Sequence, residues 1–412
     1  MANVSSSNGL EKRPKLRFPG FDEPWKAAHL SDYFAKNIKK NTDGAITNVI
    51  CNSAKQGLIP QRDYFDKDIA NSDNTDGYYI IETNDFVYNP RKSTDAPYGP
   101  ISSYNYPEAG IVSPLYLCFR AKQEINPLYF EWYFRSSAWH RYIYMSGDSG
   151  ARHDRVSIKD DIFFAMPINI PSATEQERIA LFLNAIEQKI DKQRSLVEAL
   201  KKYKRGVMSV LLTSKDNPYY SAETWKEVSL GDVASGFEYG MNAAATIYDG
   251  SHKYIRITDI DDSSHRYTQD SLVSPEGQVE EKYRVLENDI LFARTGASVG
   301  KSYCYLKSDG ELYFAGFLIR IHVNSGVDCS YVFQNTLTEA YRRWVMLESA
   351  RSGQPGINAE QYKQYRFLLP PIEIQKKISL LASNLDVRIS KGESLLSHLE
   401  QTKAALLQQL FI

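Results

Sequence analysis

Hydrophobic residues recur every three or four positions through residues 172–214. The apolar positions alternate in steps of four and three, and this 3.5-residue period is typical of a coiled-coil seam. Eight of the ten seam positions are apolar: Ile179, Leu183, Ile186, Ile190, Val197, Leu200, Val207 and Leu211. Gln193 and Lys204 occupy the other two. The pattern predicts one long helix with a narrow apolar stripe.

The same pattern returns in residues 371–412. Residues 175–212 align with residues 374–411 without a gap, at a constant offset of 199. The apolar seam positions of this second copy are Ile378, Ala382, Leu385, Ile389, Leu396, Leu399, Leu406 and Leu410. Its two breaks, Gly392 and Lys403, fall at the positions of the two breaks in the first copy. The chain therefore contains an internal duplication, and each copy ends in a long helix.

The length of the two predicted helices bears on what they pack against. Each has about 38 residues and so spans ~57 Å, which exceeds the diameter of a small domain. One interpretation is that each helix packs on its own globular domain. The length favours the other interpretation, in which the two helices pair with each other. A two-fold relation between the copies makes the pair antiparallel, with a globular domain at each end, and we interpret Lys204 and Lys403 as register or solvation features near the ends of the coiled coil.

A second block of the duplication marks the start of each globular stretch, because Trp25-Lys26 aligns with Trp225-Lys226 at an offset of 200. A chain of 412 residues has room for two domains of ordinary size besides the helices. We predict a polar tail over 1–16, a first globular domain over 17–171, a first coil helix over 172–214, a linker over 215–224, a second globular domain over 225–370 and a second coil helix over 371–412.

Within each globular stretch, runs typical of β-strands precede an aromatic segment typical of helices. The strand-like runs are 78–81, 85–88 and 111–120 in the first stretch and 254–257, 289–292 and 312–323 in the second. The aromatic segments are 129–144 and 331–346. Strands followed by helices, without strict βαβ alternation, predict the α+β class for both domains. The full prediction is two α+β domains separated by an antiparallel coiled coil, with a pseudo-two-fold internal repeat.

The loops between the matching strands differ strongly between the copies, as recognition loops on a common scaffold do. They are rich in side chains that hydrogen-bond base edges or phosphates. The candidate DNA-binding residues are Arg91, Lys92, Ser93, Tyr104, Asn105, Arg152 and Arg155 in the first copy, and Tyr239, Asn242, Lys253, Arg294, Thr295, Ser298, Lys301, Arg351 and Gln354 in the second. A single polar loop is more often a solvated turn. Matching loops in both copies favour the functional interpretation.

Composition constrains the surroundings of the protein more than its ligand. The 49 basic and 50 acidic residues give a net charge of −1, so overall charge does not indicate a polyanion partner. Four cysteines without a CxxC pair, and seven scattered histidines, predict a reducing compartment and no metal site. The first sixteen residues lack the apolar core of a signal peptide, and the sequence has no apolar run long enough to cross a membrane. We expect a soluble, cytoplasmic protein without membrane contact.

Three segments approach catalytic motifs without matching them. Residues 296–302 (GASVGKS) have three residues between the glycines where a P-loop needs four. Residues 217–220 (NPYY) lack the second proline of an amino-methyltransferase loop and suggest a helix-stop signal. Residues 280–282 (EEK) have no counterpart in the other copy, as half of a nuclease element should. We find no catalytic constellation and expect no cofactor on this chain.

Several segments resemble the specificity (S) subunit of type I restriction-modification systems, over nearly the whole chain from Leu16. The resemblance is strongest in residues 17–21 (RFPGF), 225–232, 289–301 (DILFARTGASVGK) and 352–358 (SGQPGIN). The first copy departs from it, because residues 151–157 and 89–91 replace the corresponding second-copy segments.

The resemblance implies a non-catalytic subunit whose two recognition domains each bind half of a bipartite site in double-stranded DNA. It implies that the paired helices set the spacing and dock methyltransferase (M) subunits, which carry S-adenosylmethionine. Endonuclease/translocase (R) subunits are expected to join the complex later. Two alternatives stay open: a self-contained DNA nuclease or methyltransferase with an unrecognised active site, and a coiled-coil adaptor without a DNA role.

Overall fold

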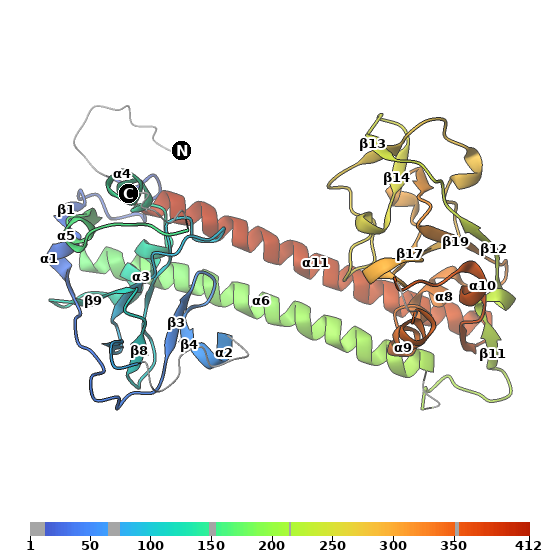
Figure 1. The fold of residues 1–412 in the computed structure, drawn as a ribbon, viewed down its shortest axis with the longest axis horizontal. Helices are drawn as coiled ribbons and strands as arrows, with labels where there is room; N and C mark the ends of the chain where they lie inside the picture. The colour runs from blue at the N-terminus through green and yellow to red at the C-terminus, as the bar shows by residue number, and fades with distance from the viewer. Residues whose placement is uncertain (1–12, 65–74, 148–153, 214–215, 351–353) are drawn as a thin grey trace. The chain divides into compact units, whose positions relative to one another are not determined.

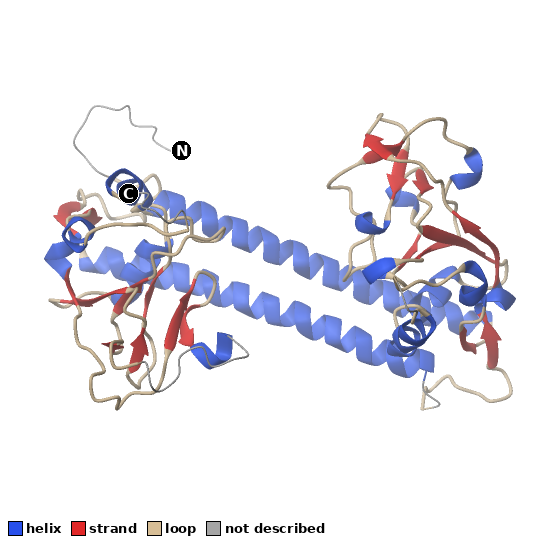
Figure 2. Cartoon of the chain, viewed as in Figure 1, coloured by secondary structure: helices blue, strands red, loops and turns tan. Residues whose placement is uncertain are grey.

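The computed structural model describes residues 13–64, 75–147, 154–213, 216–350 and 354–412. The chain divides into two compact units, one formed by residues 1–193 with 395–412 and the other by residues 194–394. Each unit combines small β-sheets with short helices and with parts of two long helices (Figures 1 and 2). The predicted α+β class is confirmed in both units.

In its described residues, the first unit holds strands β1 to β10 and five short helices. The strands are β1 (Lys26–His29), β2 (Phe34–Lys36), β3 (Ile50–Ser53), β4 (Gly57–Pro60), β5 (Tyr79–Ile81), β6 (Phe86–Tyr88), β7 (Ile101–Ser103), β8 (Gly110–Val112), β9 (Leu117–Ala121) and β10 (Pro167–Ile170). The helices are α1 (Leu30–Tyr33), α2 (Gln61–Tyr64), α3 (Pro127–Arg135), α4 (His140–Ser146) and α5 (Asp160–Phe164). Its main sheet has four antiparallel strands in the order β2-β9-β6-β7.

The second unit repeats this plan. Its strands are β11 (Lys226–Ser229), β12 (Ala234–Tyr239), β13 (Ala245–Ile247), β14 (Lys253–Ile255), β15 (Val273–Pro275), β16 (Asp289–Ala293), β17 (Ser302–Cys304), β18 (Leu312–Phe314), β19 (Leu318–Val323) and β20 (Arg366–Leu369). Its short helices are α7 (Leu230–Val233), α8 (Cys329–Asn335), α9 (Glu339–Glu348) and α10 (Ala359–Lys363), with 3₁₀ turns η2 (Ile257–Asp259), η3 (Glu281–Tyr283), η4 (Gly296–Ser298) and η5 (Lys307–Asp309). The main sheet, β12-β19-β16-β17, is again antiparallel throughout.

The duplication extends to strand register and to single hydrogen bonds. β1 pairs antiparallel with β10, and β11 pairs antiparallel with β20. After each first strand, an aspartate caps a one-turn helix: the carboxylates of Asp32 and Asp232 accept the backbone N–H of His29 and Ser229, both at 2.7 Å. One pair of strands differs, because β5 and β8 are antiparallel whereas β14 and β18 are parallel.

Two of the strand-like runs predicted from sequence each divide into two strands in different sheets. Residues 312–323 form β18 and β19, with Gly316 between them, and residues 111–120 lie across β8 and β9. In the first unit, a turn closed by the N–H of Tyr116 and the carbonyl of Ser113 separates the strands. The aromatic segments 129–144 and 331–346 likewise each contain two helices. The composition of a run does not locate such turns.

The long helices are α6 (Ala173–Thr213), with 41 residues, and α11 (Ile372–Leu410), with 39 residues. All the apolar seam positions predicted on both helices are buried or half-buried. In the second unit, Lys204 contacts Asp386 at 2.6 Å and Lys201 contacts Glu393 at 2.9 Å. A higher residue number on α6 thus contacts a lower residue number on α11, so the two helices run antiparallel, as predicted.

The two seam lysines have acidic partners on the opposite helix. Lys403 contacts Glu187 at 2.7 Å within the first unit, and Lys204 contacts Asp386 within the second. Both lysines and both acids are related by the offset of 199 that relates the copies. The lysines are therefore half-buried members of two equivalent ion pairs, which makes them register features of the helix pair.

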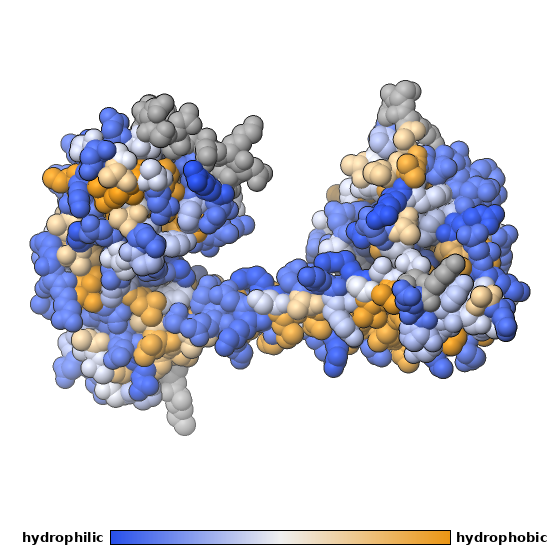
Figure 3. All heavy atoms as spheres, turned by 90° about the horizontal axis from the view of Figure 1, so that it is seen from below, coloured by the Kyte–Doolittle hydropathy of each residue, from blue (hydrophilic) through white to orange (hydrophobic). Residues whose placement is uncertain are grey.

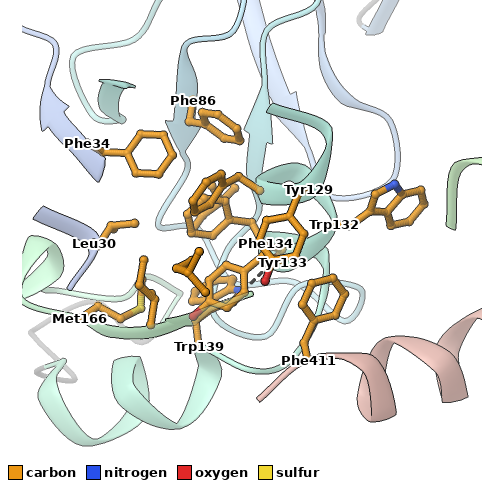
Figure 4. Packing of buried hydrophobic residues seen from close by; sticks show 14 of the residues in the cluster. Leu30, Phe34, Phe86, Tyr129, Trp132, Tyr133, Phe134, Trp139, Met166 and Phe411 are labelled. Carbon is orange, nitrogen blue, oxygen red and sulfur yellow. Dashed lines mark hydrogen bonds between the residues drawn. The ribbon is translucent and has the colours of Figure 1, made fainter. Parts of the chain in front are cut away.

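The ends of the long helices also complete the cores of the globular domains. In the first unit, Ile179 and Leu183 of α6 and Leu410 at the end of α11 join an aromatic cluster that includes Phe34 and Tyr133. The Phe411 ring lies 5.7 Å from that of Tyr129 and 6.1 Å from that of Tyr133 (Figure 4).

The second unit follows the same rule. Met208 and Leu211 from the end of α6 and Ile378 and Ala382 from the start of α11 pack with Trp225. Within each unit, the two long helices therefore pair with each other and also pack on the globular domain.

Candidate nucleic-acid interface

In both units, the loop that follows a central strand of the main sheet pairs with the loop that precedes the last short helix. The strands are β6 and β16, and the helices are α5 and α10. In the first unit, Arg91 forms an isolated antiparallel bridge with Arg155, and the N–H of Lys92 donates to the carbonyl of Asp154 at 2.8 Å. In the second unit, Thr295 forms the equivalent bridge with Gly356. The loops that the sequence marked as candidates in each copy are therefore brought together in pairs.

Arg294 lies at the centre of the second pair of loops. Its guanidinium carbon is 5.1 Å from the ring centroid of Tyr239 and 5.8 Å from that of Phe317. Its Nε donates to the carbonyl of Gly316 at 2.9 Å. Tyr239 is 45% exposed and Phe317 59% exposed. A restrained cation beside two exposed rings is able to bind a polar, planar or anionic group at the surface.

The backbone around this cluster sets the position of both rings. The N–H of Met241 donates to the carbonyl of Phe314, and the N–H of Gly316 donates to the carbonyl of Met241, both at 2.8 Å. The two segments approach so closely that a Cβ on Gly240 would lie 2.2 Å from the carbonyl oxygen of Ala315. Glycine at position 240 is required for this approach, and Tyr239 and Phe317, which adjoin the two approaching segments, both lie near Arg294.

Gln354 belongs to the same neighbourhood. Its side chain is exposed, and its Nε2 would lie 3.3 Å from a Cβ on Gly296. The N–H of Gly296 donates to the carbonyl of Pro355 at 3.0 Å. Tyr239, Arg294, Thr295 and Gln354, all candidates from the sequence, thus lie around one pair of loops.

Other second-unit candidates have internal partners. The side chain of Lys301 is 10% exposed, and its ammonium ion-pairs with Asp262 and donates to the carbonyl of Ile260 at 2.9 Å. The ammonium of Lys253 donates to the carbonyl of Asp309 at 2.7 Å. Both lysines therefore cross-link segments of the domain, and we leave them out of the proposed interface. Ser298 lies half-buried in η4.

Asn242 is an exposed residue that follows the tight approach at Gly240. It remains a candidate of this interface.

The first-unit candidates divide in the same way. Arg91 and Ser93 are exposed, Lys92 and Arg155 are half-buried, and Asn105 is exposed with its amide 3.2 Å from the hydroxyl of Ser103. Arg155 Nε lies 3.9 Å from the carboxylate of Asp154.

Tyr104 corrects the sequence prediction, because it is fully buried in a core cluster. Its hydroxyl donates to the carbonyl of Glu108 at 2.8 Å, and burial raises the pKa of that hydroxyl. Tyr104 therefore supports the loop from inside. Arg152 and Arg351 lie outside the described residues.

Phe317 belongs to the cluster around Arg294, and sequence reasoning missed it. It was included in the strand-like run 312–323, in which an aromatic residue is expected to pack. The signal that could have identified it is Gly316, since a glycine inside such a run often marks a break.

The segments that approach catalytic motifs have structural roles. η4 is followed by β17, whereas a P-loop is followed by a helix. The amide of Asn217 donates to the carbonyl of Leu211 at 2.6 Å, so this residue closes the end of α6 as the sequence suggested. Lys282 contacts Glu280 at 2.7 Å on the surface. Among the described residues, no group of three or more His, Cys, Asp or Glu side chains is placed to hold a metal ion.

Residues 222–400 match the family model of the type I restriction modification DNA specificity domain. The match covers the second globular domain and most of the second long helix. The specificity subunit of the type I restriction enzyme StySPI from Salmonella potsdam is 25% identical over 272 residues, which cover 63% of this chain and 58% of that protein. The putative MjaX specificity subunit of Methanocaldococcus jannaschii is 25% identical over 194 residues, 46% of each chain. The chain spans about half the length of these specificity-subunit relatives.

Two solved structures align with nearly the whole chain and share its fold. The S subunit of the type I system from M. genitalium aligns over 97% of this chain and 99% of its own, with a TM-score of 0.58 and 14% identity. A chain from a structural study of complex assembly and conformational transition of the type I R-M system aligns over 96% and 99%, with the same TM-score and identity. Within the described residues, no helix is both long and apolar enough to span a bilayer.

Proposed function

We propose that the chain is the DNA-specificity subunit of a type I restriction-modification complex. Each globular domain, over residues 17–171 and 225–370, recognises one half of a bipartite site in double-stranded DNA. The observation that carries the proposal is the repeated pairing of two candidate loops in both domains, at Arg91 with Arg155 and at Thr295 with Gly356. A scaffold with duplicated strand order and divergent loops suits two different half-sequences.

The chain has no catalytic role in this proposal. Methyltransferase subunits bind S-adenosylmethionine and transfer the methyl group, and endonuclease/translocase subunits join the complex to cleave DNA. With this division of labour, we expect the protein to act in the cytoplasm, where the DNA is. The self-contained nuclease or methyltransferase is the alternative, and no observation on the described residues favours it.

The long helices set the spacing of the half-sites and dock the methyltransferase subunits. Besides their buried seams, both helices expose apolar residues at equivalent positions, and apolar residues are visible on the surface in Figure 3. Leu181 and Leu380, related by the offset of 199, are 56% and 64% exposed. Leu196 and Leu395, related by the same offset, are 52% and 45% exposed. Repeated exposed leucines favour a protein partner that binds both copies.

The DNA-binding proposal is tested with the complete complex. Single-molecule sequencing of methylated sites in a host that carries the whole system should show a two-part sequence with an unspecified spacer. The chain alone, mixed with DNA and S-adenosylmethionine, should neither transfer a methyl group nor cleave. Methyl transfer or cleavage by the isolated chain would establish the alternative, and a failure to retard DNA at low and at moderate salt would support the adaptor.

The docking proposal is tested by charge on the helix surface. Leu181→Asp together with Leu380→Asp should abolish co-purification with the methyltransferase subunits, because each change places a charge in an apolar contact. Gln188→Asp, on an exposed position of α6, is the matched control and should leave assembly unchanged. An intact complex with both leucines replaced would locate the docking surface elsewhere.

A further inference from the structure

We infer that the second recognition domain recognises a guanine through Arg294 and the methyl group of an adjacent thymine through Phe317. The inference rests on the proposed function and specifies part of the second half-site. Its starting point is the cluster of Tyr239, Arg294 and Phe317, in which two exposed aromatic rings lie close to one guanidinium.

Arg294 is restrained in a way that leaves its terminal nitrogens available. Its Nε donates to the carbonyl of Gly316, and its guanidinium carbon lies 5.1 and 5.8 Å from the ring centroids of Tyr239 and Phe317. Among the described residues, no hydrogen bond or ion pair to its two terminal nitrogens is found. Those two nitrogens form the fork that donates to O6 and N7 of guanine in the major groove. A fork that is already ordered loses little side-chain entropy on binding.

Other arginines of the same domain show what makes Arg294 different. Arg256 ion-pairs with Asp259 at 2.7 Å, and Arg284 with Glu281 at 2.8 Å. Arg320 also lies over an aromatic ring, that of Phe314 at 5.0 Å, but it contacts Glu238 and donates to the carbonyl of Arg284. Each of these guanidinium groups is neutralised within the domain. Arg294 has the same aromatic support and no carboxylate partner within the part of the chain that the structure describes.

Phe317 supplies an apolar group beside this fork. It lies between β18 and β19, directly after Gly316, and more than half of its side chain is exposed. The thymine methyl is the apolar group that a base edge presents in the major groove, and phenylalanine is one of the side chains that contact it. The ring centroid lies 5.8 Å from the Arg294 guanidinium, which suits a base pair next to the guanine.

The first domain lacks this arrangement. The residue that follows β6 is Asn89, whose amide donates to the carbonyl of Asn52 at 3.1 Å and whose Oδ1 accepts the N–H of Arg91. Both ends of this side chain are therefore bonded within the domain. The guanine and methyl contacts are expected in the second half-site, and the first half-site serves as an internal control.

The test measures binding of the assembled complex to synthetic duplexes of its own recognised sequence. Replacing the guanine by 7-deazaguanine in the second half-site should weaken binding by roughly tenfold or more. Replacing the adjacent thymine by deoxyuridine, which removes only the methyl group, should weaken binding by a few-fold. The same changes in the first half-site should not depend on Arg294 or Phe317.

Variants assign each effect to its side chain. Phe317→Ala should bind the thymine and deoxyuridine duplexes equally, and Arg294→Lys should lose the sensitivity to 7-deazaguanine. Leu115→Ala removes a 60%-exposed apolar side chain from the first domain and should retain both effects. The Phe317→Leu variant should unfold at the same temperature as the wild type and should distinguish thymine from deoxyuridine to an intermediate degree. This result would separate the loss of a contact from a folding defect.

Three results would overturn the inference. A second half-site without a guanine next to a thymine excludes it directly. Retention of the methyl effect in Phe317→Ala shows that another group contacts the methyl. Equal weakening of Arg294→Lys on specific and unrelated DNA shows a phosphate contact. A wild-type complex that binds no DNA instead refutes the proposed function itself, and the inference falls with it.

Discussion

Two aspartates show how the duplication preserves a residue while its partner changes. Asp85 and Asp289 each follow an asparagine with φ of 70°, a left-handed conformation that asparagine tolerates well. Each carboxylate accepts the backbone N–H three residues earlier, at 2.8 Å. In the first unit this carboxylate binds Arg120 at 2.6 Å, whereas in the second it lies 2.8 Å from His322. The turn is thus present in both copies, but the basic side chain that contacts its carboxylate differs between them.

Glu82, beside this turn, predicts a pH dependence of stability for the first unit. The charge of Arg120 and a hydrogen bond from Lys39 lower the pKa of Glu82. The unfolded state therefore binds the proton more tightly, so this contribution is present above pH ~4.3 and is lost as pH falls through the lowered pKa. In urea unfolding between about pH 3 and pH 7, Glu82→Gln should reduce the acid sensitivity. Glu124→Gln, at an exposed position in the same unit, should leave the acid sensitivity unchanged. If the free energy of unfolding varies with pH equally in Glu82→Gln and in the wild type, the assignment is contradicted.

The cysteines of the second unit predict a selective cross-link. The sulfurs of Cys304 and Cys329 are 3.6 Å apart. A disulfide requires a sulfur–sulfur distance of ~2.05 Å, so the two side chains need to move only a short way to form one. The thiol contact with Cys304 and burial raise the pKa of Cys329, so oxidation should be slow near neutral pH and faster as pH rises. Treatment with diamide followed by alkylation and peptide mass spectrometry should show this pair joined. Cys51 and Cys118 should stay free, and a mixture of pairings would contradict the geometry.

At the residue scale, the sequence located side chains with suitable chemistry but not the direction in which they point. Arg294 and Tyr239 were identified from their loops, yet their contact depends on a close approach at Gly240 that only the folded chain brings about. Tyr104 was identified from the composition of its loop in the same way, but its side chain is buried. Whether an aromatic side chain near a strand end faces the core follows from register, which local composition does not contain.

The helix pair provides a prediction at the scale of elements. Lys204→Glu should destabilise the second unit by about 1 kcal/mol, because it replaces a half-buried attraction with a repulsion. Adding Asp386→Lys restores opposite charges and should recover most of the loss. Urea unfolding of the two single variants and the double variant gives the coupling energy. Losses that simply add would show that the two side chains do not interact.

The same exchange at Lys403 and Glu187 should act on the first unit. A matching coupling energy at both sites would support the equivalence of the two ion pairs.

Sequence predicted these helices to within two residues at each end, since a 3.5-residue period sustained over ten seam positions is a local and redundant signal. The strands were less predictable. Residues 312–323 form one continuous strand-like run in the sequence, but β18 pairs with β14 and β19 lies between β12 and β16. The separation depends on partners distant in sequence. The parallel pairing of β14 with β18 has no local signature at all.

At the scale of the whole molecule, both long helices pass without a break from one compact unit into the other. If the helices set the half-site spacing, one heptad inserted after Gln193 and one after Gly392 keep the seam in phase and add ~10 Å. Sequencing of the sites methylated by this variant should show both half-sequences retained and the spacer longer by about three base pairs. An unchanged spacer would refute the spacing role and leave DNA recognition intact.

A heptad inserted into one helix alone is the control. It shifts the register of Lys204 and Lys403 against their partners and should reduce stability without a defined new spacer.

The packing of Phe411 against Tyr129 and Tyr133 has a consequence for synthesis on the ribosome. Residues 17–171 leave the exit tunnel early, but the core that they form includes Leu410 and Phe411. At about 5–20 residues per second, the intervening chain takes on the order of ten seconds or more to translate. The second unit has its core residues, from Met208 to Ala382, before that time. The domain that is translated first is therefore completed last, and until then its aromatic core is open to chaperones and proteases.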